Sequence, residues 1–344
     1  MPSGEYEYTD YLDDDGIDVG VPVKLQLKIT VKGDEITYDF TGTAPQVKGA
    51  LNNPYGSTMA CVVTSLREMM SPDIPRNGGV WRPAKLIIPE GTLLNPKLPA
   101  ACASRGGTLF READVMLGAT AKIRPDKIPA TVSTGDHLLN IGGRDKDGKP
   151  FILIETLWGG WGGRSTSDGP DYNSPPSENG SNQVIETNEE IYPVIYTQHG
   201  FVPDREGAGK YRGSVALIRE WKFIGDEAVF QLRTDRQRFC PPGACGGEDG
   251  ACSESIWNPD TENRHIGKIT LLMKKGDVYR LITSGAGGWG NPLERDPKFV
   301  LDDVINEKVS LKRAREAYGV VINEKTMRVN SAETERLRTA MEKT

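Results

Sequence analysis

Two glycine-rich runs, each built around a tryptophan, are the segments of this 344-residue sequence best suited to contact a small molecule. The first is LWGGWGGR (157–164) and the second is GAGGWGNP (285–292). Glycine lets a backbone approach another surface closely, and tryptophan supplies a rigid apolar wall with one N–H donor. Two interpretations fit: corners in which Trp161 and Trp289 plug a core, or backbone N–H groups that face a substrate or an oxyanion. The spacing leaves both open.

The usual catalytic and phosphate-binding motifs are missing from the sequence. Neither run lies as GxGxxG between a strand and a helix, and neither ends in the GK[ST] of a P-loop. The histidines His137, His199 and His265 lack the spacing of metal ligands, and no serine lies in a GxSxG elbow. We therefore assign no catalytic residue and no metal site within the chain.

Cysteines and a run of aspartates are the remaining candidates for metal chemistry. The five cysteines are odd in number and no export signal is visible, so we expect reduced thiols. The gaps between Cys240, Cys245 and Cys252 differ from the CxxC pairs of structural zinc sites, which favours a Gly/Pro loop. The acidic run at 13–18 does not match a calcium-binding loop, and we expect it to be solvated surface.

Composition excludes several classes of partner. The 42 basic and 48 acidic residues give a net charge of −6, and no basic cluster is present, so we expect no nucleic acid. No apolar stretch approaches the ~18 residues of a membrane span, and the N-terminus lacks a signal-peptide pattern. We expect no membrane contact and a cytoplasmic location.

Periodicity predicts an α+β fold: β-rich mixed sheets with hairpins, a few packed helices and a helical C-terminus. The glycine- and proline-rich stretch 165–182 should be a loop with a functional or mobile role. Three parts are expected, over 1–125, 126–295 and 296–344. The predicted elements are a hairpin over 21–40, helices over 55–70 and 109–123, a hairpin over 130–157, strands joined at IGDE within 210–233 and at KKGD within 268–283, and helices after Asp296, Ser310 and Asn330.

Five segments together resemble the hydantoinase B/oxoprolinase family, which includes large subunits of ATP-dependent hydantoinases, 5-oxoprolinase, and the acetone and acetophenone carboxylases. They follow the family's order over nearly the whole chain. The segments are ITYDFTGTAPQVKGALNNP (36–54), LNPKLPAACASR (94–105), ETLWGGWGGRSTSDG (155–169), DREGAGKYRGSVALIREW (204–221) and the stretch 276–322.

The resemblance covers only the C-terminal part of such a large chain. Family members carry a further N-terminal region with Gly-Asp, Asn-Asp-Pro and Thr-His residues that resemble a metal site, and nothing similar precedes Ile36. The chain is therefore expected to be a separately encoded half or a truncated product. The resemblance implies no cofactor in this chain, ATP-Mg on a hydantoinase A-like ATPase subunit, and a divalent metal (Zn or Mn) on a polypeptide that carries the N-terminal half.

The function implied is that of one subunit in an ATP-dependent carboxylase or cyclic-amide hydrolase, inactive alone, which forms the chamber or channel for a phosphorylated intermediate made from a small-molecule substrate. Excluding bulk water would protect that intermediate. The segment SENGSNQVIETNEE (177–190) is closer to the carboxylase-type members, which favours a carboxylase. The alternative is a structural or assembly subunit without chemistry of its own.

The resemblance also favours a lining role for the glycine runs. A side chain added at their glycines should then reduce activity more than folding. The other candidates also have purely structural interpretations. Asp39 and Asn53 would cap turns, Arg164 would pair with a surface carboxylate, and Glu186 would be a solvated helix residue. The candidate lining residues are Asp39, Asn53, Gly159, Gly160, Trp161, Arg164, Asn182, Glu186, Gly287, Gly288 and Trp289.

Overall fold

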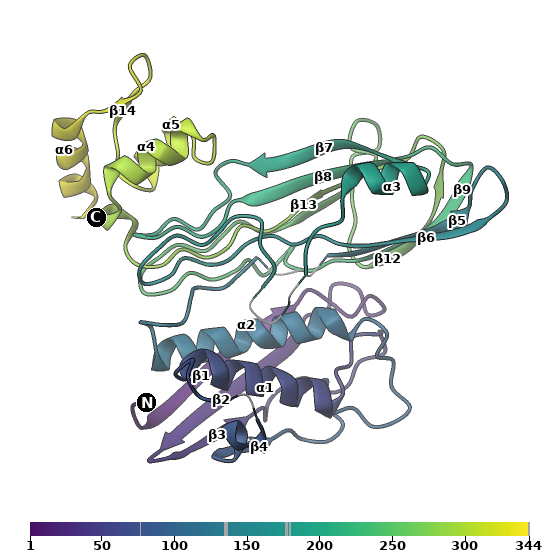
Figure 1. The fold of residues 1–344 in the computed structure, drawn as a ribbon, viewed down its shortest axis with the longest axis horizontal. Coiled ribbons are helices and arrows are strands. Elements are labelled where there is room, and N and C mark those ends of the chain that lie inside the picture. The colour runs from purple at the N-terminus through teal and green to yellow at the C-terminus, as the bar shows by residue number, and fades with distance from the viewer. Residues whose placement is uncertain (76, 134–136, 176–177, 179, 343–344) are drawn as a thin grey trace.

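The first layer of the fold is a four-stranded sheet with two helices on one face (Figure 1). The computed structural model describes residues 1–75, 77–133, 137–175, 178 and 180–342. The hairpin expected over 21–40 is confirmed, and both expected helices are present, with the second beginning at Arg105 rather than Leu109. The elements are β1 (Gly4–Leu12), β2 (Val23–Lys32), β3 (Glu35–Asp39), α1 (Tyr55–Met69), the short helix η1 (Gly78–Trp81), β4 (Ala84–Ile87) and α2 (Arg105–Ile123), with strand order β1-β2-β3-β4.

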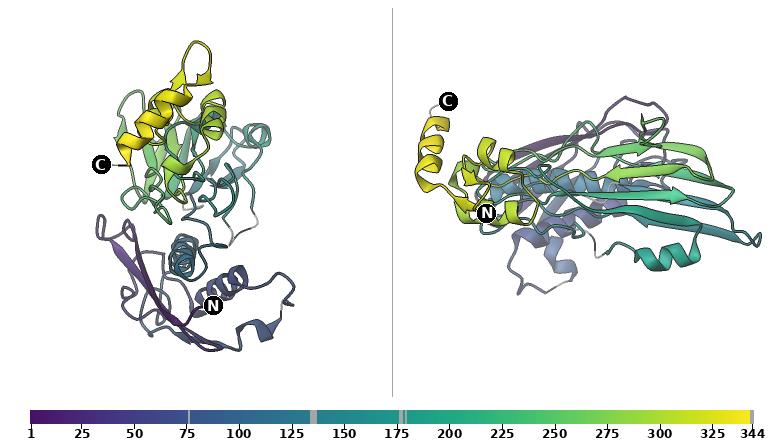
Figure 2. Two further views of the ribbon diagram at one scale, coloured as in Figure 1. Left: turned by 90° about the vertical axis from the view of Figure 1, so that its left-hand side faces the viewer. Right: turned by 90° about the horizontal axis from the view of Figure 1, so that it is seen from above.

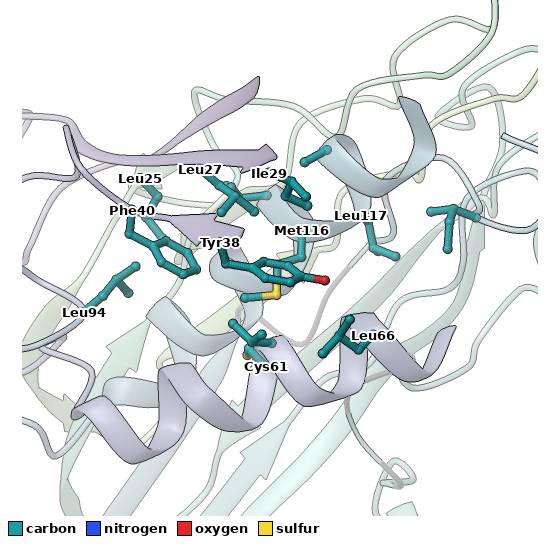
Figure 3. Close-up of a cluster of buried hydrophobic side chains, with 14 of the residues drawn as sticks. Leu25, Leu27, Ile29, Tyr38, Phe40, Cys61, Leu66, Leu94, Met116 and Leu117 are labelled. Atoms are coloured by element: carbon teal, nitrogen blue, oxygen red, sulfur yellow. The ribbon is translucent and has the colours of Figure 1, made fainter. Parts of the chain in front are cut away.

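The core of this layer lies between the sheet and the two helices. Every second side chain of β2 is buried, because successive side chains of a strand point to opposite faces. Figure 3 shows Leu27 and Ile29 of β2 beside Met116 of α2, with Tyr38 of β3 between the sheet and α1. The layer thereby holds α1 with one face toward the core.

The second layer is a sandwich of two antiparallel sheets (Figure 2). The sheets bury one core, in which Phe230 contacts Trp257 and Tyr279 at ring-centroid distances of 5.0 Å. The sheet orders are β11-β10-β13-β8-β7 and β12-β9-β5-β6. The strands are β5 (Leu138–Arg144), β6 (Pro150–Thr156), β7 (Val194–Val202), β8 (Ala216–Phe223), β9 (Glu227–Arg233), β10 (Glu254–Trp257), β11 (Arg264–His265), β12 (Ile269–Lys274) and β13 (Val278–Ile282), and α3 (Ile185–Ile191) precedes β7.

Strands that the sequence joins by short turns do not always pair. The hairpin expected over 130–157 is present as β5 and β6. By contrast, β8 and β9 lie in opposite sheets, and so do β12 and β13. Their turns at IGDE and KKGD therefore connect the two sheets rather than close hairpins.

The C-terminal part is a small helical cluster (Figure 1). The expected N-caps are confirmed: the side chains of Asp296, Ser310 and Asn330 accept hydrogen bonds from backbone N–H groups in the first turn of the following helix. The elements are η2 (Pro292–Glu294), α4 (Pro297–Ile305), α5 (Leu311–Glu316), β14 (Ile322–Asn323), β15 (Arg328–Val329) and α6 (Ser331–Met341).

These elements confirm the α+β class with a helical C-terminus. Whether the parts over 1–125, 126–295 and 296–344 are separate domains stays a prediction. Among the described residues, no helix combines the length and the apolar character needed to cross a membrane.

The sequence predicted that the acidic run at 13–18 would be solvated surface, which is wrong for Asp13 and Asp15, whereas Asp18 is exposed. Asp13 and Asp15 are each 5% exposed. The carboxylate of Asp13 accepts hydrogen bonds from the backbone N–H groups of Gln237 and Arg238, and that of Asp15 accepts one from Gly49 N. The run therefore joins the first layer to the loop that follows β9.

The expectation of reduced thiols is wrong for two of the cysteines. Cys240 and Cys252 form a disulfide, because the Gly/Pro loop folds back and brings their Cα atoms to 4.5 Å. Cys61, Cys102 and Cys245 are free.

We predict that thiol titration of the denatured, unreduced chain will find three reactive thiols rather than five, because a disulfide does not react. The same titration after reduction should find all five and serves as the control. Five thiols before reduction would contradict the disulfide.

Candidate functional site

The two glycine runs lie in a bundle of extended segments joined by backbone hydrogen bonds. We call it the glycine bundle. Gly163 N donates to Gly287 O at 2.9 Å, and Tyr211 and Trp289 exchange two backbone hydrogen bonds. The segments run side by side from the sandwich toward the C-terminal helices (Figure 1). They comprise residues 130–133, 159–163, 205–214, 241–250 and 285–290.

Close approach between these backbones explains the glycines. A Cβ on Gly287 would lie 2.1 Å from Pro242 O, and one on Gly288 would lie 2.1 Å from Ala208 O. Only glycine fits where extended chains pack at such distances. In the same way a Cβ on Gly159 or Gly160 would meet Ser133 or Ser214 at 2.1 and 2.3 Å.

A large cavity opens beside the first glycine run, and we call it the α1 cavity. Its volume is about 1060 Å³, and it lies between α1, η1 and the loop that follows Trp161. The Trp161 side chain lines the cavity and its Nε1–H donates to Ser174 O at 2.6 Å, which holds the loop against the ring. The lining residues are Met59, Val63, Thr64, Arg67, Glu68, Met70, Pro72, Asn77, Gly78, Val80, Trp81, Trp161, Asn173, Ser174, Pro175 and Glu178.

Helix α1 presents a second face to this cavity. Cys61, Leu66 and Met69 point into the core, whereas Met59 and Val63, four residues apart, line the cavity. Residues four apart lie on one face of a helix. The next turn adds Glu68 to the cavity wall.

Glu68 is the polar group of the cavity whose titration is most altered. Burial raises the pKa of its carboxyl to about 7, because loss of hydrating water disfavours the charged form. Among the described residues, none makes a hydrogen bond or an ion pair with this carboxyl. A carboxyl with this pKa exchanges a proton near neutral pH.

A second cavity of about 560 Å³ lies between the first layer and the sandwich. Ser104, Gly106 and Gly107 at the start of α2 line it, together with Trp158. Glu178 lines both cavities, so they are neighbours.

The structure places Asp39, Asn53 and Arg164 outside the α1 cavity wall. Asp39 Oδ1 accepts a hydrogen bond from Thr41 N at 2.9 Å within a turn. Asn53 is fully buried, and its Nδ2 donates to Glu112 Oε2 at 2.8 Å. Arg164 Nη2 donates to Asp168 O at 3.1 Å.

Of the other candidates, Asn182 and Trp289 contact neighbouring residues of the protein, and Glu186 is exposed to solvent. Asn182 Oδ1 accepts from Trp158 N at 2.9 Å, and Glu186 is exposed in the first turn of α3. Trp289 lies in the glycine bundle, 6.3 Å from the Tyr211 ring between centroids. The structure thus brings Trp161 to the α1 cavity, and a lining role for the remaining candidates stays a prediction.

Ion pairs hold the stretch 165–175 of the loop that follows the first glycine run. Asp168 pairs with Arg295 at 2.5 Å, and Asp171 pairs with Arg212 at 3.0 Å. Asp303 of α4 accepts from both arginines, at 2.9 Å from Arg212 and 2.7 Å from Arg295. The loop beside the α1 cavity is therefore fixed to the glycine bundle and to α4.

The described residues contain no group of three or more His, Cys, Asp and Glu side chains placed to hold a metal ion. The donor set for the divalent metal that the family resemblance implies is therefore not found in this part of the chain.

Sequence reasoning missed Glu68 and Trp81. The sequence did contain a signal for them. Helix α1 carries more apolar residues than a single face toward the core requires, and Glu68 lies among these additional apolar residues. Which neighbour covers that second face depends on the loop from residue 161 onward, and no local pattern gives that contact.

Comparison with known proteins gives one family. The sequence profile of "Hydantoinase B/oxoprolinase" matches residues 1–292. The B-type component of a putative D-/L-hydantoinase from a Pseudomonas species is 30% identical over 340 residues, which cover 94% of this chain and 57% of that protein.

Solved structures share the fold. The ATP-dependent caprolactamase of Pseudomonas jessenii superposes with a TM-score of 0.86 at 24% identity, over 98% of this chain and 60% of that one. Nucleotide-free acetone carboxylase superposes with a TM-score of 0.87 at 17% identity, over 100% of this chain and 53% of that one. The chain spans 56% and 57% of the length of two curated relatives that it matches, and 23% of the length of the 5-oxoprolinase of Saccharomyces cerevisiae.

Proposed function

The chain belongs to the hydantoinase B/oxoprolinase family, and from this membership we propose that it is one subunit of an ATP-dependent cyclic-amide hydrolase or carboxylase complex. The α1 cavity would be the chamber that handles the phosphorylated intermediate. The observation that carries this proposal is that α1 and Trp161 of the first glycine run both line an open cavity of about 1060 Å³.

The chemistry would be divided among subunits. A hydantoinase A-like partner holding ATP-Mg would supply the phosphoryl group, and a polypeptide corresponding to the other half of the longer relatives would supply the divalent metal. Phosphorylation of a carbonyl oxygen converts it into a leaving group. This chain would bind the small molecule and shield it from water with the walls that Met59, Val63 and Trp161 provide.

Reconstitution tests the proposal. We expect no substrate-dependent ATP hydrolysis by the chain alone, and coupled hydrolysis when the ATPase subunit and the other half are added. The substrates to compare are hydantoin, 5-oxoproline, caprolactam and acetone, with ADP release as the measurement. Coupled hydrolysis by the isolated chain would overturn the division of labour.

A cavity-filling variant separates a chamber from a purely structural role. Val63→Trp should reduce coupled turnover at least tenfold while the complex still assembles, because the larger ring occupies the α1 cavity. Ile305→Trp, at a residue 55% exposed on α4, is the matched control and should leave turnover unchanged. Unchanged turnover by Val63→Trp in an intact complex would indicate the assembly role instead.

A further inference from the structure

One sheet of the sandwich carries exposed apolar side chains on the face that points away from the core. Leu272 of β12 is paired with Val229 of β9. Gly142 of β5 is paired with Val229 on one side and with Ile152 of β6 on the other. Together with Ile154 on β6, these residues form what we call the apolar patch. Its four aliphatic residues are between 47% and 64% exposed, and exposed apolar surface of this kind marks an interaction site.

The residues around the apolar patch match the anatomy of a protein interface. On the side toward the first layer, Asn140 of β5 is paired with Gln231 of β9, so this neighbouring row is polar but uncharged. On the other side, the exposed residues Lys274 and Glu227 are paired with each other. Protein interfaces are depleted in charge at their centre and polar at their rim. The patch therefore has the composition of an interface centre.

Gly142 puts no side chain between Val229 and Ile152 in the middle of the apolar patch. A Cβ at Gly142 would lie 3.8 Å from both Ile152 Cγ1 and Phe151 O, so this chain itself leaves space for one. Glycine inside a strand weakens the strand and often marks a place where another backbone approaches closely. The position therefore fits contact with a further polypeptide.

The first layer already packs on the other end of the same sheet face. Leu138 of β5 and Thr156 of β6 are paired, and both line the second cavity together with Gly106 at the start of α2. Leu138 and Gly142 belong to one face, because residues four apart in a strand point to the same side. The sandwich extends past the end of the layer that holds α1 and α2 (Figures 1 and 2). The apolar patch lies on the part of the face that the first layer leaves exposed.

We propose that the apolar patch is the docking surface for the polypeptide that corresponds to the part of the longer relatives outside their match to this chain. The inference rests on the proposed function for the identity of this partner and adds where the partner binds. The two solved structures superpose on 98% and 100% of this chain but on 60% and 53% of their own chains. Their further polypeptide is of domain size and packs against some surface of the shared fold. An uncovered apolar sheet face is the kind of surface that such a domain buries.

The size of the patch argues against a second copy of this chain as the occupant. With strands about 4.8 Å apart and a rise of about 3.3 Å per residue, four strands over about five residues cover roughly 300 Å². A stable interface buries about 800 Å² on each partner. Two copies that met on the patch alone would bury too little, whereas a domain below the extending end of the sandwich also reaches the flank of the first layer.

Analytical ultracentrifugation of the full chain with a purified partner tests the proposal. The probe is the part of the Pseudomonas B-type component that lies outside its match to this chain, and the wild type should form a one-to-one complex with it. Val229→Glu and Ile152→Glu should each weaken this complex at least tenfold, because a carboxylate at the centre of an apolar interface loses its water without gaining a partner. Both residues are exposed, so the thermal unfolding midpoints should stay at the wild-type value.

Ile195→Glu is the matched control, because Ile195 is 42% exposed on the other sheet, in β7, and this variant should bind as the wild type does. A wild type that forms no complex would overturn the proposal, and so would Val229→Glu and Ile152→Glu variants that bind as tightly as the control. Self-association of the chain alone that Val229→Glu abolishes would assign the patch to a second copy instead. Turnover decides the proposed function separately: a complex that assembles through the patch but shows no coupled ATP hydrolysis would refute the function and leave the docking surface standing.

Discussion

Gly288→Ala is expected to lower the free energy of unfolding by about 3 kcal/mol or more, because the added methyl group has no space. Its Cβ would lie 2.1 Å from Ala208 O, and Ala208 is fully buried. Moving the backbone away would break the hydrogen bond from Gly288 N to Glu248 O, which is 2.9 Å long. Denaturant unfolding followed by circular dichroism measures the loss.

Gly200→Ala is the matched control, because a Cβ at Gly200 meets nothing within 4 Å. We expect its stability to stay within about 0.5 kcal/mol of the wild type. If Gly288→Ala were as stable as this control and the reconstituted complex still lost turnover, the contacts would not explain the glycine, and a direct role in lining the chamber would be supported.

The sequence suggested that a side chain added at these glycines would reduce activity more than folding. The contacts of Gly288 instead predict a large loss of stability. Glycine runs around a tryptophan indicate close approach of something to the backbone, but they do not say what approaches. For Gly287 and Gly288 the structure places Pro242 and Ala208 there, residues far away in the sequence. A pattern over eight residues carries no information about such a neighbour.

Local elements were predictable because their causes are local. The hairpin of β2 and β3 follows from alternation around a short turn, and the helix starts at Asp296 and Ser310 follow from side chains that cap the next turn. The assignment of β8 and β9 to opposite sheets was not predictable, because it depends on which surface each strand buries. The buried Asp13 was missed for the same reason.

The candidate site was predicted in one part only. Trp161 lines the α1 cavity, and the substrate- or channel-lining role that the sequence suggested for it stays a prediction. Glu68 was missed because an acidic residue on a helix is usually solvated, and its altered pKa comes from the burial that the tertiary fold creates. Residues whose chemistry depends on burial are the ones that sequence patterns reveal least.

The second large effect is expected at the junction between the first layer and the sandwich, where Asp235 is 2% exposed. Its Oδ2 accepts from Lys268 Nζ at 2.7 Å, and its Oδ1 accepts from Asp13 N at 2.9 Å. Arg111 of α2 lies 3.5 Å from Oδ1. One carboxylate thus joins α2, the acidic run and the residue before β12.

Asp235→Asn should lower the free energy of unfolding by about 3–5 kcal/mol at pH 7, because it leaves the buried charge of Lys268 with only the more distant carboxylate of Asp14, at 3.8 Å. Asp34→Asn, in the exposed turn between β2 and β3, is the control and should change stability by less than about 0.5 kcal/mol. A loss at position 235 no larger than at position 34 would show that the pair contributes nothing to stability.

The pH dependence supplies an independent check. Burial alone would raise the pKa of Asp235, but the charges of Lys268 and Arg111 outweigh it and lower the pKa to about 2. A carboxyl with a lowered folded-state pKa stabilises the fold above its unfolded-state pKa of about 4, and this stability is lost as the pH falls toward 2. Burial and the charge of Asp235 raise the pKa of the neighbouring Asp13 to about 6. In Asp235→Asn the second cause is lost while burial remains, so the contribution of Asp13 to the difference falls mainly above pH 4. The difference in unfolding free energy between wild type and Asp235→Asn should therefore shrink between pH 4 and pH 2, and a difference that stayed constant over this range would assign the loss to packing rather than to charge.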